Sequence, residues 1–150
     1  MMRMALLLLG ALAGCEEFKA TELDQPGEAI TGCRVTDDDT IRCGDERVRL
    51  IGINAPELPG HCRQGRTCAP GDPEASKASL SDALSGALTI KRSGEDSHGR
   101  TLGLVAANGH DLSCHQLESG HAIYCRDWDK GLAVQAQCPE AAARRLAPIR

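Results

Sequence analysis

The chain has 150 residues, of which 41% are hydrophobic and only 2% aromatic, and its formal net charge is -4 at pH 7. This length supports one domain around one core, which must be aliphatic because so few rings are available. The net negative charge argues against a protein that coats nucleic acid with a broad basic face. Any anionic ligand would have to be held by a few local arginines.

The first residues have the pattern of an export signal. Arg3 precedes an apolar stretch that is shorter than the roughly 20 residues needed to span a bilayer. The stretch ends in Leu12-Ala13-Gly14-Cys15, which resembles a bacterial lipobox. We therefore expect residues 1–14 to be a signal peptide, and Cys15 to be a lipid anchor in a membrane of the bacterial cell envelope, followed by a flexible tether over 15–29. The alternative is an ordinary secretory signal, which would give a secreted protein.

Seven further cysteines suit an oxidising compartment, where cysteines pair as disulfides. Cys33 and Cys43 flank the acidic residues 37–39 symmetrically, so a hairpin turning there would place them opposite each other. Cys62 and Cys68 bracket a short loop that a second bridge could close. Zinc binding is the alternative, but no Cys-x-x-Cys spacing supports it. One more bridge and one free thiol are expected among the remaining three: Cys114, Cys125 and Cys138.

From residue 30 onward, short strand signals alternate with turns. We predict strands over 30–35, 40–42, 47–53, 88–91 and 101–106, the last of which enters an Asn108-Gly109 turn. Asp72 followed by Pro73 predicts the start of a helix that reaches residue 86. Short helices are also predicted over 111–118 and 140–146. Five strands with two to three helices indicate an α+β fold, a small five-stranded β-barrel of the OB type, in one domain over residues 30–150.

Segment 48–57 carries the strongest indication of a site. Its apolar residues fit a strand buried on most of its surface, but Arg49 lies among them and requires an anionic partner. Pro56 ends the strand, so Asn54 and Glu57 leave the strand end together, where Arg49 could reach them. The structural alternative is a plain Arg49–Glu57 ion pair at the surface.

Three separated motifs resemble those of the staphylococcal-nuclease-like (thermonuclease) family. The segment Val35-Thr36-Asp37-Asp38-Asp39-Thr40 resembles the family's Val-x-Asp-Gly-Asp-Thr turn. Segment 49–57 resembles its third strand, which ends in Pro-Glu, and Asp96-Ser97-His98-Gly99-Arg100 resembles its Asp-x-Tyr-Gly-Arg loop. The motifs occur in order and at compatible spacing, so the resemblance covers about residues 30–125.

The resemblance implies an OB-fold enzyme that cleaves DNA and RNA with one calcium ion. It implies side-chain ligands at Asp39 and Asn54 and a backbone ligand at the carbonyl of Ala55. Thr40 and Glu57 would make outer contacts with the ion through water. All these donors are oxygens, as calcium requires.

The resemblance also implies roles for three catalytic residues. Arg49 and Arg100 would hold the scissile phosphate and stabilise the charge that develops on its oxygens. Glu57 would orient or deprotonate the attacking water.

Three features of the sequence depart from the family pattern. Asn54 stands where the family usually has aspartate, so calcium should bind more weakly. Asp38 stands where the family usually has glycine, and it would have to accept a turn geometry that glycine favours. It could restore the missing negative charge as a further ligand, although we expect it to be solvated. The family's stacking tyrosines have no aligned counterpart, so a stacking ring would come from Trp128 or Tyr124; core packing is the alternative, and it suits Tyr124 better.

We therefore predict an envelope-anchored, disulfide-stabilised, calcium-dependent nuclease with DNA or RNA as substrate, low sequence preference and a monomeric state. The joint presence of Arg49, Glu57 and Arg100 supports an enzyme. One alternative is an OB-type module that binds nucleic acid or a protein partner without cleavage, which Asn54 favours. A third possibility is an envelope lipoprotein whose charged pairs only stabilise the barrel.

Overall fold

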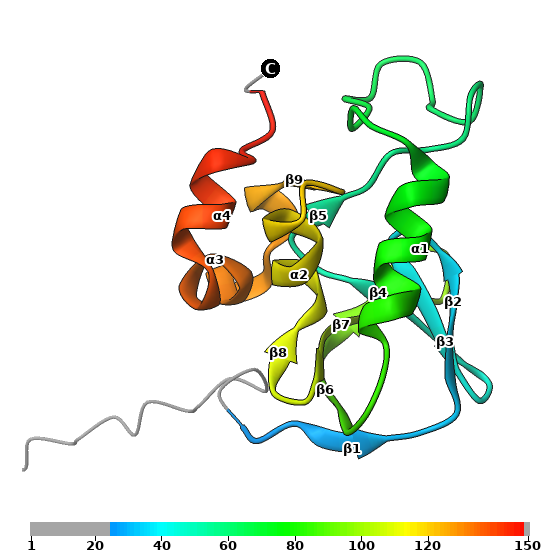
Figure 1. Ribbon diagram of the computed structural model, residues 1–150, viewed down its shortest axis with the longest axis vertical. Coiled ribbons are helices and arrows are strands. Elements are labelled where there is room, and N and C mark those ends of the chain that lie inside the picture. Colours follow the sequence, from blue (N-terminus) through cyan, green and yellow to red (C-terminus); the bar gives the residue numbers. More distant parts are fainter. Residues whose placement is uncertain (1–24, 149–150) are drawn as a thin grey trace, which may run out of the picture.

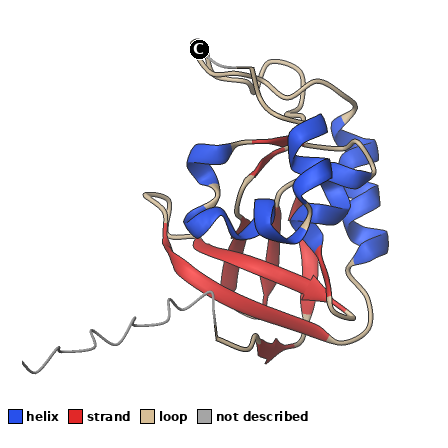
Figure 2. Ribbon diagram, turned by 90° about the vertical axis from the view of Figure 1, so that its left-hand side faces the viewer, coloured by secondary structure: helices blue, strands red, loops and turns tan. Residues whose placement is uncertain are grey.

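A computed structural model describes residues 25–148 of the chain. The predicted signal peptide and the predicted lipid anchor at Cys15 lie outside the described residues. Within the described residues, no helix is long and apolar enough to cross a membrane. The fold is α+β and of the OB type, with a curled sheet on one side and the helices gathered on the other (Figure 2).

The main sheet is mixed and forms a half-barrel. Its order is β1-β6-β7-β4-β3-β2, and β8 pairs with β7. Strands β4 and β7 run parallel, whereas the other neighbours are antiparallel. The five predicted strands are present as β2, β3, β4, β6 and β7. The strands are β1 (Glu28–Ile30), β2 (Cys33–Asp37), β3 (Thr40–Cys43), β4 (Glu46–Leu50), β6 (Leu88–Glu95), β7 (Thr101–Ala107) and β8 (His110–Asp111).

The ordered domain begins earlier than the sequence indicated. Glu28 and Ala29, which we expected in the flexible tether, belong to β1 and pair with Ile90 and Thr89 of β6. The Glu28 carboxylate also accepts a hydrogen bond from Arg92 at 2.5 Å. Backbone pairing and this ion pair together fix a segment whose polar composition alone indicated a tether.

The predicted strand over 47–53 is broken in the structure. Strand β4 ends at Leu50, the chain turns through Gly52 at a φ of 74°, and the short β5 (Ile53–Asn54) pairs with β9 (Ile123–Tyr124) in a second sheet. A Cβ at position 52 would lie 2.9 Å from Val134 Cγ2, so the turn needs glycine both for its backbone angle and for space. The break separates Arg49 from Asn54 and places them on different sheets.

Four α-helices lie against the sheets: α1 (Pro73–Ala83), α2 (Leu112–Glu118), α3 (Ala133–Gln137) and α4 (Pro139–Arg144). Helix α2 contacts both α1 and α4, and it lies between them in Figure 1. The prediction for α1 is confirmed at its start, where Asp72 Oδ1 accepts a hydrogen bond from the backbone N–H of Glu74 at 2.9 Å. Helix α4 is shorter than predicted, and α3 was not predicted. Two 3-10 helices, η2 (Arg126–Trp128) and η3 (Lys130–Leu132), connect β9 to α3.

The core is aliphatic, as the composition required, with one exception. Tyr124 is only 2% exposed, and its hydroxyl donates a hydrogen bond to Asp129 at 2.8 Å. Among the described residues there are three disulfides, of which Cys33–Cys43 and Cys114–Cys138 contact the core and Cys62–Cys68 lies in a surface loop. The predicted Cys33–Cys43 and Cys62–Cys68 bridges are confirmed, and the third joins Cys114 to Cys138, which leaves Cys125 as a free thiol.

Candidate active site

Adjacent strands bring Asp39, Thr40 and Arg49 together. Thr40 of β3 lies opposite Arg49 of β4, and the backbone N–H of Leu50 donates to the Asp39 carbonyl at 2.9 Å. The Arg49 guanidinium binds Asp39 Oδ2 at 2.5 Å, and the Thr40 hydroxyl donates to Asp39 Oδ1 at 2.8 Å. Both oxygens of this buried carboxylate are therefore engaged, and Arg49 has the anionic partner that its position in the strand required.

Arg100 approaches the same group from the loop between β6 and β7. Asp96 accepts hydrogen bonds from the backbone N–H groups of His98 and Arg100 at 2.8 and 3.0 Å, and from Arg100 Nε at 2.8 Å. Burial acts to raise the pKa of Asp96, but these donors outweigh it and hold that pKa at about 2. The oriented Arg100 then donates through Nη1 to the Thr40 hydroxyl at 3.3 Å. An arginine of β4 and an arginine of the β6–β7 loop thus converge on one Asp39–Thr40 pair.

Glu57 lies near this group but is held by a different partner. Its carboxylate is 3.4 Å from Arg66, so the Arg49–Glu57 pair considered from the sequence is replaced by Arg49–Asp39 and Arg66–Glu57. Arg49 and Arg66 both lie over the Trp128 ring, with Cζ 5.0 and 5.5 Å from its centroid. Trp128 therefore connects the two ion pairs. Sequence reasoning missed Arg66, although its place inside the Cys62–Cys68 loop, close after Glu57, was a usable signal.

Asn54 is buried between the sheet and the loop that follows Glu57. Its Nδ2 donates to the carbonyl of Thr67 at 2.9 Å, so Oδ1 is the amide atom suited to ligate an ion. Arg49 Nη2 also donates to the carbonyl of Ile53 at 3.4 Å. The Arg49 guanidinium thus contacts both Asp39 and the carbonyl of Ile53, the residue before Asn54. These contacts bring two predicted ion ligands, Asp39 and Asn54, close together.

Asp38 is not solvated, so our expectation for it was wrong. Its residue is only 6% exposed, its Oδ2 has no hydrogen-bond partner, and its backbone does not adopt the positive φ expected of a glycine position. Burial, reinforced by the neighbouring Asp37, raises the pKa of Asp38 to about 8. Burial thus disfavours the charged form of Asp38, which makes it a poor replacement for the charge that Asn54 lacks.

The residues at this site match calcium in donor type but provide little charge. Among residues 25–148, no three His, Cys, Asp or Glu side chains are grouped so as to hold a metal ion. The predicted ligands comprise one carboxylate, from Asp39, together with the amide oxygen of Asn54 and the carbonyl of Ala55. All three are hard oxygen donors, which calcium prefers. Because Asp39 also binds Arg49, we expect weak ion binding.

The two rings considered for stacking have different environments. Tyr124 is a core residue, so the packing alternative holds and its ring cannot stack on a base. Trp128 is 36% exposed and borders an open pocket of about 880 Å³, which Asn54 and Thr67 also line. A pocket of this size accommodates a small organic group. Tyr124 also borders this pocket but is almost fully buried, so Trp128 is the ring better placed to meet a ligand.

This fold is that of a nuclease-type domain. The sequence profile described as staphylococcal nuclease homologue matches residues 47–146, and the chain belongs to that family. Members of this family are generally calcium-dependent. A similar protein is the succinoglycan biosynthesis protein ExoI of Rhizobium meliloti (strain 1021), which is 38% identical over 119 residues. The match covers 73% of this chain and 60% of the relative, so the chain spans less than two thirds of that protein's length.

Proposed function

We propose that this protein is a calcium-dependent phosphodiesterase that hydrolyses DNA or RNA with little sequence preference. The observation that carries the proposal is the convergence of Arg49 and Arg100 on the Asp39–Thr40 pair, in a chain that belongs to the staphylococcal nuclease family. Arg49 binds the Asp39 carboxylate while Arg100, held by Asp96, reaches the adjacent Thr40 hydroxyl, so two guanidinium groups from separate segments lie at one place. Such a pair is suited to phosphodiester cleavage, in which negative charge builds up on the phosphate oxygens.

The chain's own residues would divide the chemistry between charge stabilisation and water activation. Arg49 and Arg100 present forked donors that match two phosphate oxygens each and hold the reacting phosphorus in place. Glu57 is half-buried and its ion pair with Arg66 is long, so its carboxylate can turn to a water molecule beside the phosphate. There it would orient the water and accept its proton.

Calcium would be held by Asp39, Asn54 and the carbonyl of Ala55, with Thr40 and Glu57 in contact through water. When bound, the ion would supply positive charge that polarises the phosphate. The single carboxylate among these ligands predicts a low affinity, because ligand charge tunes calcium binding.

Cleavage by the purified domain tests this proposal. Single- and double-stranded DNA and RNA are incubated with the native protein in calcium and then in chelator, beside Arg49→Gln and the matched surface control Arg144→Gln. We expect calcium-dependent cleavage that Arg49→Gln lowers by about 100-fold or more and Arg144→Gln leaves unchanged. Circular dichroism checks that each variant is folded. Full activity in excess chelator would contradict the metal assignment, and normal activity of Arg49→Gln would remove that residue from the site.

Calorimetric calcium titration tests the ligands independently of activity. Asn54→Asp should tighten calcium binding because it adds a negatively charged ligand. Asp38→Asn should change the affinity much less, because the Asp38 carboxyl is buried and its Oδ2 has no hydrogen-bond donor that would stabilise a charge. An unchanged affinity in Asn54→Asp would exclude position 54 from the ion site.

The second candidate function is a module that binds nucleic acid or a protein partner without cleaving. The neutral Asn54 favours it, and it predicts oligonucleotide binding with no cleavage at any calcium concentration.

We also propose that Cys15 is acylated and anchors the protein to an envelope membrane. Cys15→Ser should then release the protein from the membrane fraction.

A further inference from the structure

Three arginines lie in one row across three neighbouring strands. Arg34 of β2 is directly opposite Arg42 of β3, which is directly opposite Arg47 of β4. Residues opposite each other in an antiparallel pair share a face and lie roughly 5 Å apart. The three side chains therefore leave the backbone in one row on the sheet face opposite the core, because the next register, Val35–Ile41–Val48, is the one that packs inward.

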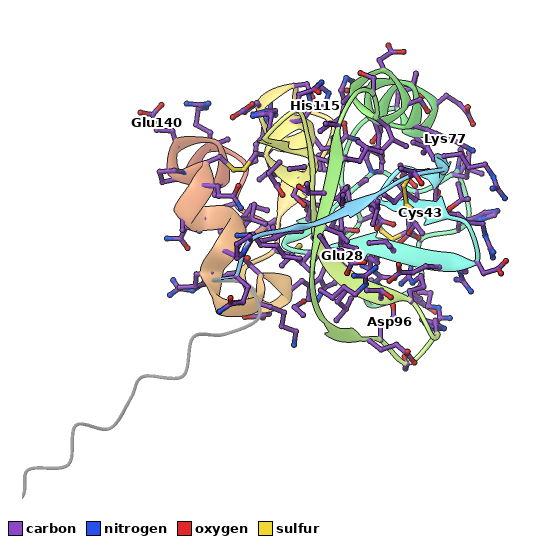
Figure 3. All side chains as sticks on the ribbon, turned by 90° about the horizontal axis from the view of Figure 1, so that it is seen from below. Glu28, Cys43, Lys77, Asp96, His115 and Glu140 are labelled. Carbon is purple, nitrogen blue, oxygen red and sulfur yellow. A yellow bond between two sulfur atoms is a disulfide. The ribbon has the colours of Figure 1, made fainter. Side chains whose placement is uncertain are left out.

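This row leads directly to the candidate active site. Two residues further along the strands, on the same face, Thr40 lies opposite Arg49. Arg42 and Arg47 also line a hollow of about 280 Å³ together with Thr40 and Arg100. In Figure 3, Cys43, which follows Arg42, and Asp96, which positions Arg100, lie on the side of the molecule away from Glu140 of α4.

The arginines of the row lack the partners that other arginines of the chain have. Within residues 25–148, none of the three forms an ion pair, and Arg42 makes only a 3.4 Å hydrogen bond to the carbonyl of Asp45. By contrast, Arg49 and Arg92 are both bound to carboxylates. Like charges directly opposite each other destabilise a sheet, and Asp37 is the one acidic residue that lines the hollow beside Arg42 and Arg47. An anionic ligand with several charges in line would offset this repulsion.

We propose that the row Arg34–Arg42–Arg47 binds consecutive phosphates of a single-stranded nucleic acid whose scissile phosphate lies at Arg49 and Arg100. This inference rests on the proposed function and extends it to a substrate class. The row is one side chain wide, in a chain with a net charge of -4, so it offers a track for one backbone rather than a broad face for a duplex. Trp128, on the far side of Arg49, would then stack a base at the other end of the path.

Oligonucleotide binding at several salt concentrations tests the row. Labelled single-stranded DNA is titrated in chelator with the native protein, with R34Q/R42Q/R47Q, and with the charge-matched control K130Q/R144Q/R145Q on the opposite side. Each phosphate contact contributes about 0.7 to the slope of log affinity against log salt concentration for single strands. The row variant should therefore lose about 2 from the slope, and the control variant should keep the native slope.

Cleavage kinetics separate this inference from the proposed function. In calcium, the row variant should raise KM for a long single strand far more than for a dinucleotide. If native protein binds with the predicted slope but cuts nothing, the row stands and the phosphodiesterase proposal fails. If cutting is normal but the row and control variants have equal slopes, the row assignment is overturned. Tighter binding of duplex DNA or of an acidic polysaccharide than of a single strand also overturns it. Should the triple variant not fold, Arg34→Gln alone must lower the slope by about 0.7.

Discussion

The candidate site joins two regions that are held in different ways. Arg49 belongs to β4 and Arg100 directly precedes its partner strand β7, and each makes short bonds to a carboxylate, Asp39 or Asp96. Glu57 instead lies in the irregular segment 55–72, where its partner Arg66 is exposed and 3.4 Å away. The backbone of the sheet thus fixes the positive charges, whereas the proposed water-activating carboxylate is on a loop that a disulfide and one hydrogen bond from Asn54 restrain.

The largest expected effects come from removing one charge in each region. Arg100→Gln and Glu57→Gln should each lower kcat by about 100-fold or more, since a preorganised group at a charged transition state is commonly worth about 3 kcal/mol. The two losses should differ in their pH profiles. If Glu57 accepts the proton of the attacking water, Glu57→Gln should abolish the fall in kcat at acidic pH. Arg100→Gln should lower kcat at every pH and leave the shape of the profile unchanged. Identical profiles would remove the distinction between the two regions.

Asp111, the N-cap of α2, should make the stability of the fold depend on pH. Asp111 caps α2 through a 2.9 Å bond from the backbone N–H of Cys114, but its Oδ2 is buried without a hydrogen-bond partner. Burial raises the pKa of Asp111 to about 6, although backbone N–H groups of Cys114 and Ser113 act to lower it. The folded protein therefore holds a proton that the unfolded chain, with a pKa of about 3.9, has already lost.

The sign follows from this difference in bound protons. The stabilisation that comes from the extra proton on folded Asp111 is fully present below about pH 4 and is lost as pH rises to about 6. The free energy of unfolding should therefore fall by up to about 3 kcal/mol over this range. Asp111→Asn keeps the cap and should abolish this part of the pH dependence in urea unfolding. Asp72→Asn, at the exposed cap of α1, is the control. A native pH dependence in Asp111→Asn would show that another group is responsible.

Removing one disulfide from each region should separate stability from activity. Both Cys33–Cys43 and Cys62–Cys68 close short loops, so C33S/C43S and C62S/C68S should each lower the free energy of unfolding by about 2 to 3 kcal/mol. Only C62S/C68S should also lower cleavage of a short substrate, because Arg66 lies inside that loop and faces Glu57. Equal activities of the two variants would mean that the bridge does not position Glu57.

The smallest effect is expected at Arg66 itself. Its ion pair with Glu57 is long and partly exposed, and such pairs contribute between zero and about 1 kcal/mol. Arg66→Gln should therefore change kcat by less than about fivefold and leave thermal unfolding nearly unchanged, with Arg63→Gln in the same loop as the control. A loss as large as that of Glu57→Gln would show that Arg66 contacts the substrate.

The parts of this molecule that depend on local patterns could be predicted from the sequence. The five long strands follow from alternating apolar residues, and the Cys33–Cys43 bridge follows from symmetry about a turn that the register of β2 and β3 confirms. The start of α1 follows from Asp72 and Pro73. Each of these features is decided by neighbours within about ten residues.

The remaining features depend on contacts between distant segments. The expectation that Asp38 is solvated was wrong because Gln116 of α2 packs against this residue. Its side chain donates to the backbone carbonyl of Asp38 at 3.4 Å. The break at Gly52 depends on Val134 of α3, and the partner of Glu57 depends on the path of the loop that carries Arg66. Periodicity and composition contain no record of such contacts, so the family motifs gave the site residues while their actual partners remained unpredicted.

The pairing of β5 with β9 also sets an order of events during synthesis of the chain. Arg49 and Asn54 leave the ribosome long before Ile123, which pairs with Asn54, and before Trp128, whose carbonyl accepts the backbone N–H of Gly52 at 2.9 Å. Until those residues have been made, the turn that separates the arginine from the asparagine lacks its contacts with β9 and Trp128. An unfinished polypeptide therefore carries Arg49 and Asn54 without the backbone pairing that fixes Asn54 in its final place.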